Sequence, residues 1–134
     1  MTRKTIILLA LGLIITLGLV WIVGKKSDHQ PKQQSTSYSA IQSEVNSKQA
    51  ELIDVRTAEE YAEGHIQDAT NFPLQQMQAG QFPEVSKTET IYVYCHSGNR
   101  SAQATQLLKA NGFTNVVDLG SITAVQAMGG VVVK

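Results

Sequence analysis

Twenty consecutive uncharged residues near the N-terminus restrict what this chain can fold into. Residues 5–24 (TIILLALGLIITLGLVWIVG) are mostly apolar, and at about 1.5 Å per residue they would form a helix about 30 Å long, enough to cross the hydrocarbon core of a bilayer. A helix that is apolar on every side has to be enclosed by protein or by lipid. The rest of the 134-residue chain is too small to enclose it, so the sequence predicts a transmembrane helix and a separate folded domain.

Basic residues flank this apolar run on both sides. The run is longer than the apolar core of a typical signal peptide, and no small-residue cleavage pattern stands near its end. We therefore predict an uncleaved, single-pass anchor over residues 1–26, a flexible polar tether over 27–37 and a folded domain over 38–134. The positive-inside rule is nearly balanced, because each flank carries two basic residues. The short charged tail favours a cytoplasmic N-terminus, which would put the domain outside the cytoplasm.

The charge and cysteine content of the predicted domain exclude several classes of protein. Residues 38–134 contain six Lys and Arg against ten Asp and Glu, a formal charge of −4. Nucleic-acid binding is therefore not expected, since it relies on basic patches that neutralise phosphate. The chain has one cysteine, Cys95, which excludes an internal disulfide framework and a zinc site built on cysteine pairs.

Short apolar runs alternate with helical patterns along the domain. The patterns predict strands over 51–55, near 69–74, over 89–94 and over 115–119, and helices over 57–63, 74–80 and 101–111. Thr57 and Glu60 have the spacing of a capping box, and Gly64 is expected to end that helix in a left-handed turn. Alternating strands and helices predict an α/β fold with a mostly parallel sheet, whose sites lie at the carboxyl ends of its strands.

The segment CHSGNRS at 95–101 lies at such a strand end and just before a helix. In this geometry consecutive N–H groups and a helix N-terminus face the centre of the loop, which favours an anion such as a thiolate. Cys95 is therefore expected to have a lowered pKa and to be nucleophilic. Gly98 allows the tight turn, and Arg100 is expected to add positive charge near the sulfur.

Four motifs of the domain together resemble the rhodanese family of sulfurtransferases. They are LIDVR at 52–56, EYAEGHI at 60–66, ATNFP at 69–73 and YCHSGNRS at 94–101. The resemblance implies a single rhodanese-like α/β domain with a central, mostly parallel sheet of about five strands flanked by helices.

The resemblance also implies a reaction. Cys95 would attack the outer sulfur of thiosulfate or a similar donor, carry it as a persulfide and pass it to cyanide or a thiol. The loop residues would hold the charge of the persulfide, and no metal or organic cofactor is implied. These loop residues are His96, Ser97, Gly98, Asn99, Arg100 and Ser101. Structural support is expected from Asp54, Arg56, Glu60 and His65.

Two other functions compete with sulfur transfer. Cysteine-dependent phosphatases and arsenate reductases also place Cys and Arg on a loop before a helix, but phosphatases separate them by five residues, whereas four lie between Cys95 and Arg100. A non-catalytic binding module or persulfide carrier at the membrane would keep the same fold. The chain also departs from the family pattern after its last strand, where Gly129-Gly130 comes late and no Trp follows, so the sequence leaves open what covers the loop.

Overall fold

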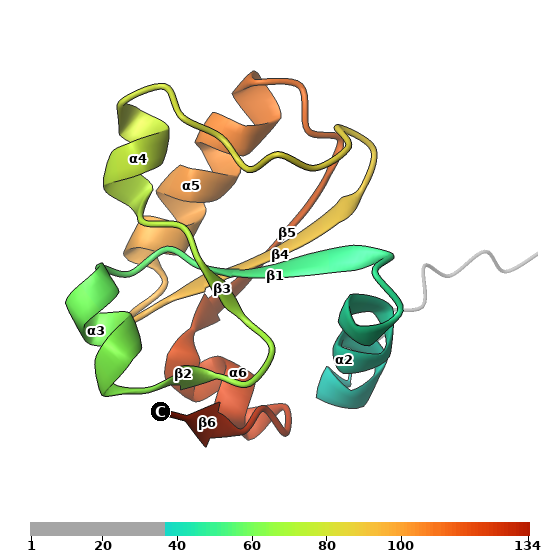
Figure 1. The fold of residues 1–134 in the computed structure, drawn as a ribbon, viewed down its shortest axis with the longest axis vertical. Coiled ribbons are helices and arrows are strands. Elements are labelled where there is room, and N and C mark those ends of the chain that lie inside the picture. The colour runs from blue at the N-terminus through green and yellow to red at the C-terminus, as the bar shows by residue number, and fades with distance from the viewer. Residues whose placement is uncertain (1–36) are drawn as a thin grey trace, which may run out of the picture. The chain divides into compact units, whose positions relative to one another are not determined.

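The computed structural model describes residues 37–134, in which a parallel sheet has helices on both faces (Figure 1). The strand order is β3-β1-β4-β5, and every neighbouring pair is parallel. The strands are β1 (Ala50–Asp54), β3 (Thr70–Asn71), β4 (Thr90–Cys95) and β5 (Asn115–Ser121). The helices are α2 (Tyr38–Asn46), α3 (Ala58–Glu63), α4 (Leu74–Gln78), α5 (Asn99–Ala110) and α6 (Ile122–Ala127). This confirms the predicted α/β class.

The two faces of the sheet bury separate apolar clusters. Ile53, Val55 and Val93 pack with α4 and α5 on one face, whereas Leu52 and Tyr92 pack with α2 and α6 on the other. Successive residues of a strand point to opposite faces, so the adjacent apolar residues within β1 and within β4 supply both clusters at once. Both strands are central in the sheet. The carboxyl end of β4 therefore lies between β1 and β5.

The sheet has four strands in the described part of the chain, not the predicted five. Its edge strand β3 covers only two residues and ends before Phe72-Pro73, as expected because proline has no N–H to donate to a sheet. A separate antiparallel pair joins β2 (His65–Ile66) to β6 (Val132–Val133). The C-terminal segment therefore pairs with the chain after α3 and does not extend the main sheet.

Local capping explains how α3 begins and ends. The Thr57 side chain accepts from the N–H of Glu60, and the Glu60 carboxylate accepts from the N–H of Thr57, which confirms the capping box. The predicted left-handed turn at Gly64 is wrong, because its φ is 157° and its ψ is 136°. Glycine still suits this position, because L side chains rarely adopt this φ and a Cβ would lie 3.1 Å from the Val132 side chain, closer than ordinary contact.

No helix within residues 37–134 is both long and apolar enough to span a bilayer. The predicted anchor over 1–26 lies outside the described residues, as does the predicted tether except for Ser37, which immediately precedes α2.

Candidate active site

Cys95 is the last residue of the central strand β4, and its side chain is fully buried. A register irregularity between Val93 and Tyr94 interrupts the pairing of β4 with β5 just before the cysteine. Bulges of this kind redirect a strand and are common beside active sites. The sequence prediction that the single thiol lies at the carboxyl end of a central parallel strand is confirmed.

The loop after Cys95 turns back toward the sulfur. Gly98 has a φ of 94°, in the left-handed region that favours glycine, and its N–H donates to Cys95 Sγ at 3.0 Å. Ser101 Oγ donates to the carbonyl of Gly98 at 3.0 Å and lies 3.3 Å from the carbonyl of Gly120. These contacts hold the loop against the start of α5, which begins at Asn99, two residues before its predicted start.

The surroundings of Cys95 favour its thiolate. Burial alone would raise the pKa of the thiol, but hydrogen bonds from the N–H groups of Ser101, Gly98 and Ser97, together with the nearby Ser101 hydroxyl, outweigh it and lower the pKa. The N–H of Gly98 points at the sulfur, so the loop has a donor in place that favours negative charge at this position.

Replacing Ser101 by alanine is expected to raise the pKa of the Cys95 thiol, because the variant loses a hydroxyl that favours the thiolate. Alkylation of Cys95 by iodoacetamide at neutral pH should slow by roughly three- to tenfold, the size expected for the loss of one typical hydrogen-bonding group, about 0.5–1.5 kcal/mol. Thr105→Val is the matched control, because the buried Thr105 hydroxyl on the same helix has no hydrogen-bond partner. Equal alkylation profiles for the Ser101 variant and the wild type would contradict this assignment.

Arg100 is paired with Glu60. Its two terminal nitrogens donate to the two carboxylate oxygens at 2.6 and 2.7 Å, in a bidentate ion pair that joins the first turn of α5 to α3. The pKa of Arg100 is raised chiefly by these bonds, with a smaller contribution from Cys95. The guanidinium charge that was expected to act on the sulfur is therefore already balanced by a carboxylate.

Hydrogen bonds from Arg100 lower the pKa of Glu60 from its ordinary 4.5 to about 2. Because the folded-state pKa is depressed, the stability that this carboxylate contributes is fully present above about pH 4.5 and is lost as the pH falls through about 2. Acid unfolding of the wild type should therefore show a component in this window that Glu60→Gln lacks. Urea unfolding at a series of pH values between 2 and 6 measures it, and parallel pH profiles for the two proteins would refute the pairing.

Asp54 and Arg56 lie at the carboxyl end of β1, next to the carboxyl end of β4 where Cys95 lies. Asp54 is fully buried, and its carboxylate accepts from the backbone N–H and the guanidinium of Arg56 at 2.6 to 3.0 Å. Arg56 also donates to the carbonyl of Gly64 at 2.7 Å. The Asn71 amide completes the network by donating to the backbone carbonyls of Asp54 and Arg56. This network ties β1, β3 and the end of α3 together.

Of the remaining predicted site residues, His65 packs against a neighbouring ring, whereas three residues of the loop are exposed to solvent. His65 stacks on Tyr61 with ring centroids 3.7 Å apart, and its Nδ1 lies 3.0 Å from the Tyr61 carbonyl. His96, Ser97 and Asn99 are exposed at the outer side of the loop. His96 is therefore the one predicted histidine that a substrate approaching the loop can meet directly.

A hollow of about 420 Å³ lies beside the loop and includes residues that sequence reasoning missed. One side of it is formed by α6 and β6, through Ile122, Gln126 and Val132. The rest of its wall includes Glu63, Gly64 and His96. Helix α6 and strand β6 therefore cover the region beside the loop. Both are too short to show a clear periodicity in the sequence. Ser121 is the one local signal for the start of α6, because its side chain caps the helix by accepting from the N–H of Ala124.

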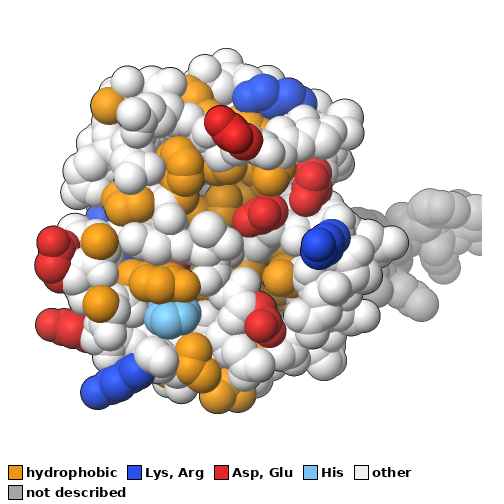
Figure 2. Space-filling view, in the orientation of Figure 1, with side chains coloured by type: hydrophobic (Ala, Val, Ile, Leu, Met, Phe, Trp, Pro, Cys, Tyr) orange, Lys and Arg blue, Asp and Glu red, His pale blue; other side chains and the backbone are white. Residues whose placement is uncertain are grey.

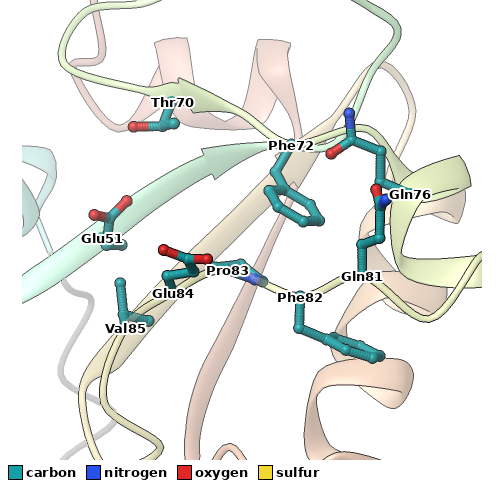
Figure 3. Close-up of a pocket in the computed structure, with 9 residues that line it drawn as sticks. All are labelled: Glu51, Thr70, Phe72, Gln76, Gln81, Phe82, Pro83, Glu84 and Val85. Atoms are coloured by element: carbon teal, nitrogen blue, oxygen red, sulfur yellow. The ribbon is translucent and has the colours of Figure 1, made fainter.

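A larger hollow of about 680 Å³ lies on another part of the surface. Figure 2 shows acidic side chains around its apolar floor, and Figure 3 shows Phe72, Phe82 and Val85 in that floor with Glu51 and Glu84 beside them. None of the predicted site residues lines it. The chemistry that the structure supports is therefore at Cys95, although the larger hollow is elsewhere.

The fold and the site define a class of protein: an α/β domain with a buried, ionisable cysteine at the end of a central parallel strand, cradled by N–H donors of the following loop. The Rhodanese-like domain model matches residues 37–128 of this chain, and the chain belongs to this family.

Several relatives and solved structures of this family are sulfurtransferases. The chain is 38% identical over 73 residues to Thiosulfate sulfurtransferase PspE of Escherichia coli, covering 52% of this chain and 68% of that protein. It is 38% identical over 74 residues to a sulfurtransferase of Allochromatium vinosum, covering 54% and 68%. The human single-domain sulfurtransferase TSTD1 superposes with a TM-score of 0.58 at 25% identity, covering 68% of this chain and 92% of that structure.

Proposed function

We propose that this protein is a sulfurtransferase in which Cys95 carries sulfur as a persulfide from thiosulfate or a similar sulfane donor to cyanide or a thiol. The observation that carries the proposal is the buried Cys95 sulfur, which accepts a hydrogen bond from Gly98 at 3.0 Å and has a lowered pKa. The similarity to proteins identified as sulfurtransferases supports the same chemistry.

The reaction divides into two displacements at sulfur. The Cys95 thiolate attacks the outer sulfur of thiosulfate, the S–S bond of thiosulfate breaks, and sulfite leaves with the bonding electron pair. Cyanide or a thiolate then attacks the outer sulfur of the Cys95 persulfide, and the Cys95 thiolate leaves unchanged. The N–H groups of the loop over 96–101 hold the negative charge in both states.

Turnover of thiosulfate and cyanide by the purified chain tests the proposal. We expect equal amounts of sulfite and thiocyanate, each far exceeding the amount of protein. One sulfite per protein without thiocyanate would identify a persulfide carrier, and failure of every sulfane donor to transfer sulfur to Cys95 would favour a non-catalytic binding module. Hydrolysis of p-nitrophenyl phosphate would identify a phosphatase, which the four-residue spacing between Cys95 and Arg100 argues against.

We also propose that the domain is attached to a membrane through residues 5–24 and lies outside the cytoplasm. Support comes from the uncharged length of that segment and from its basic flanks. Extraction of membranes with alkaline carbonate should leave the full chain in the pellet, and a protease added to intact cells after removal of the outer wall should digest the domain. Release by carbonate would contradict the anchor, and protection from protease would contradict the orientation.

A further inference from the structure

A groove on the surface takes no part in the proposed chemistry at Cys95. The hollow of about 680 Å³ and another of about 440 Å³ both have Glu51 and Thr70 in their walls, so the two join into one groove. It follows the side of β1 on which only the short β3 pairs with it. No residue of the loop over 95–101 lines either hollow. We call this surface the edge groove.

The floor of the edge groove is apolar. Phe72, Phe82 and Val85 are half-buried, pack against the apolar cluster under α4 and α5, and line the larger hollow. In Figure 3 the rings of Phe72 and Phe82 lie between Glu51 and Glu84 on one side and two glutamines on the other. Covering such a surface with another apolar group is favourable. The floor therefore suits an apolar side chain of an occupant.

The walls of the edge groove are acidic, as Figure 2 shows. Glu51 and Glu84 line the larger hollow, and Asp68 and Glu89 line the smaller one. Among the described residues of both walls, Lys48 is the only basic one, and none of the four carboxylates forms an ion pair. Burial and the nearby Glu89 raise the pKa of Glu51. A cation beside these carboxylates would relieve their repulsion, so the groove is complementary in charge to a basic partner.

The edge groove also exposes a strand edge. β3 pairs only with Ile53 and Asp54. In the described part of the chain, the three residues 50–52 therefore pair with β4 on one side and with no strand on the other. All three line the smaller hollow. An open edge offers N–H and C=O groups to an extended polypeptide, which favours a peptide segment over a small cation as the occupant.

We propose that the edge groove binds an extended, basic segment of a partner protein, with an apolar side chain between its lysines or arginines. The apolar side chain lies over Phe72 and Phe82, the basic groups lie beside the glutamates, and the backbone of the segment follows residues 50–52. A second copy of this chain is less suited, because the folded domain itself has a formal charge of −4. The proposal does not rest on sulfur transfer.

Fluorescence anisotropy with a labelled peptide tests the proposal. The probe is lysine-lysine-phenylalanine-valine-lysine-lysine, which in extended form has an apolar side chain between two lysines on each face. One comparison peptide has serine in place of phenylalanine and valine, and another has glutamate in place of every lysine. The full chain should bind the probe at least tenfold more tightly than either comparison peptide, because only the probe supplies both the apolar contact and the complementary charge.

Variants locate the binding. Glu51→Gln/Glu84→Gln should weaken it roughly fivefold, the effect of losing two ion pairs near the surface. Thr70→Lys should weaken it more than tenfold, since it adds a positive charge at the exposed position that both hollows share. Glu59→Gln is the matched control, because Glu59 is an exposed carboxylate on α3 that lines neither hollow, and it should bind as the wild type does. If the double variant does not fold, Glu84→Gln replaces it, since Glu84 is exposed.

Hydrogen exchange provides a second readout of the same binding. The bound probe should slow exchange over residues 50–52 and leave it unchanged over 95–101. Three results would overturn the proposal: a probe that binds no better than the comparison peptides, wild-type affinity in the groove variants, or protection over 95–101 in place of 50–52. A protein inactive in sulfur transfer would leave these measurements unaffected, because none of them uses the thiol.

Discussion

Replacing Cys95 by serine is expected to lower kcat/KM for sulfur transfer by a factor on the order of 10⁴ or more, because the variant lacks the nucleophile on which both displacements depend. The fold should persist. Serine is smaller than cysteine but can accept the hydrogen bond that Gly98 donates at this position. Turnover with thiosulfate and cyanide measures the activity, and urea unfolding followed by circular dichroism measures the stability.

The comparison of the two measurements distinguishes a nucleophile from a core residue. Cys95 is fully buried and belongs to the apolar cluster under α4 and α5, so a purely structural cysteine would lose stability and activity together. We expect a loss of stability on the order of 1 kcal/mol alongside the near-complete loss of activity. Activity that fell only in proportion to the folded fraction would contradict the catalytic role.

Asp54→Ala is expected to have the largest effect on stability. The change leaves the Arg56 guanidinium buried, with a side chain only 7% exposed, and without its carboxylate partner. Breaking a buried ion pair by removing one member costs about 3–5 kcal/mol, since the remaining charge stays desolvated. The free energy of urea unfolding should fall by this amount, a large part of the 5–15 kcal/mol that a typical domain has.

A double variant shows whether the loss comes from the orphaned charge. Asp54→Ala/Arg56→Met removes both charges and should recover a substantial part of the loss, because a pair replaced by apolar groups costs far less than a broken pair. A loss below about 1 kcal/mol for Asp54→Ala, or no recovery in the double variant, would contradict the role of this network. If Asp54→Ala does not fold, Asp54→Asn provides a milder measurement of the same pair.

The parts of the fold that the sequence predicts correctly depend on residues that lie close together in the sequence. The capping box requires only Thr57 and Glu60, three residues apart, and β4 follows from a run of β-branched and aromatic residues. The turn at Gly98 and the position of Cys95 at a strand end are both encoded within one continuous stretch of sequence, residues 94–101. Local chemistry is sufficient for each of these features, so each can be seen in a single stretch of sequence.

The features that sequence reasoning missed depend on residues far apart in the chain. Glu60 and Arg100 are 40 residues apart, and no local pattern shows that each neutralises the other. The pairing of β2 with β6 likewise joins His65 to Val133. Because of this pairing, the C-terminal strand lies outside the main sheet. Helix α2 was also missed, although its buried Tyr38 and Ile41 stand three residues apart and indicate one helical face.

Intact mass spectrometry of the purified full chain, before and after thiosulfate or an organic persulfide, tests the central claim most directly. The account predicts a gain of one sulfur, about 32 Da, that is reversed by cyanide and is absent from Cys95→Ser. A reduced, folded wild type that gains no mass from either donor, or a Cys95→Ser variant that gains the same mass, would contradict it.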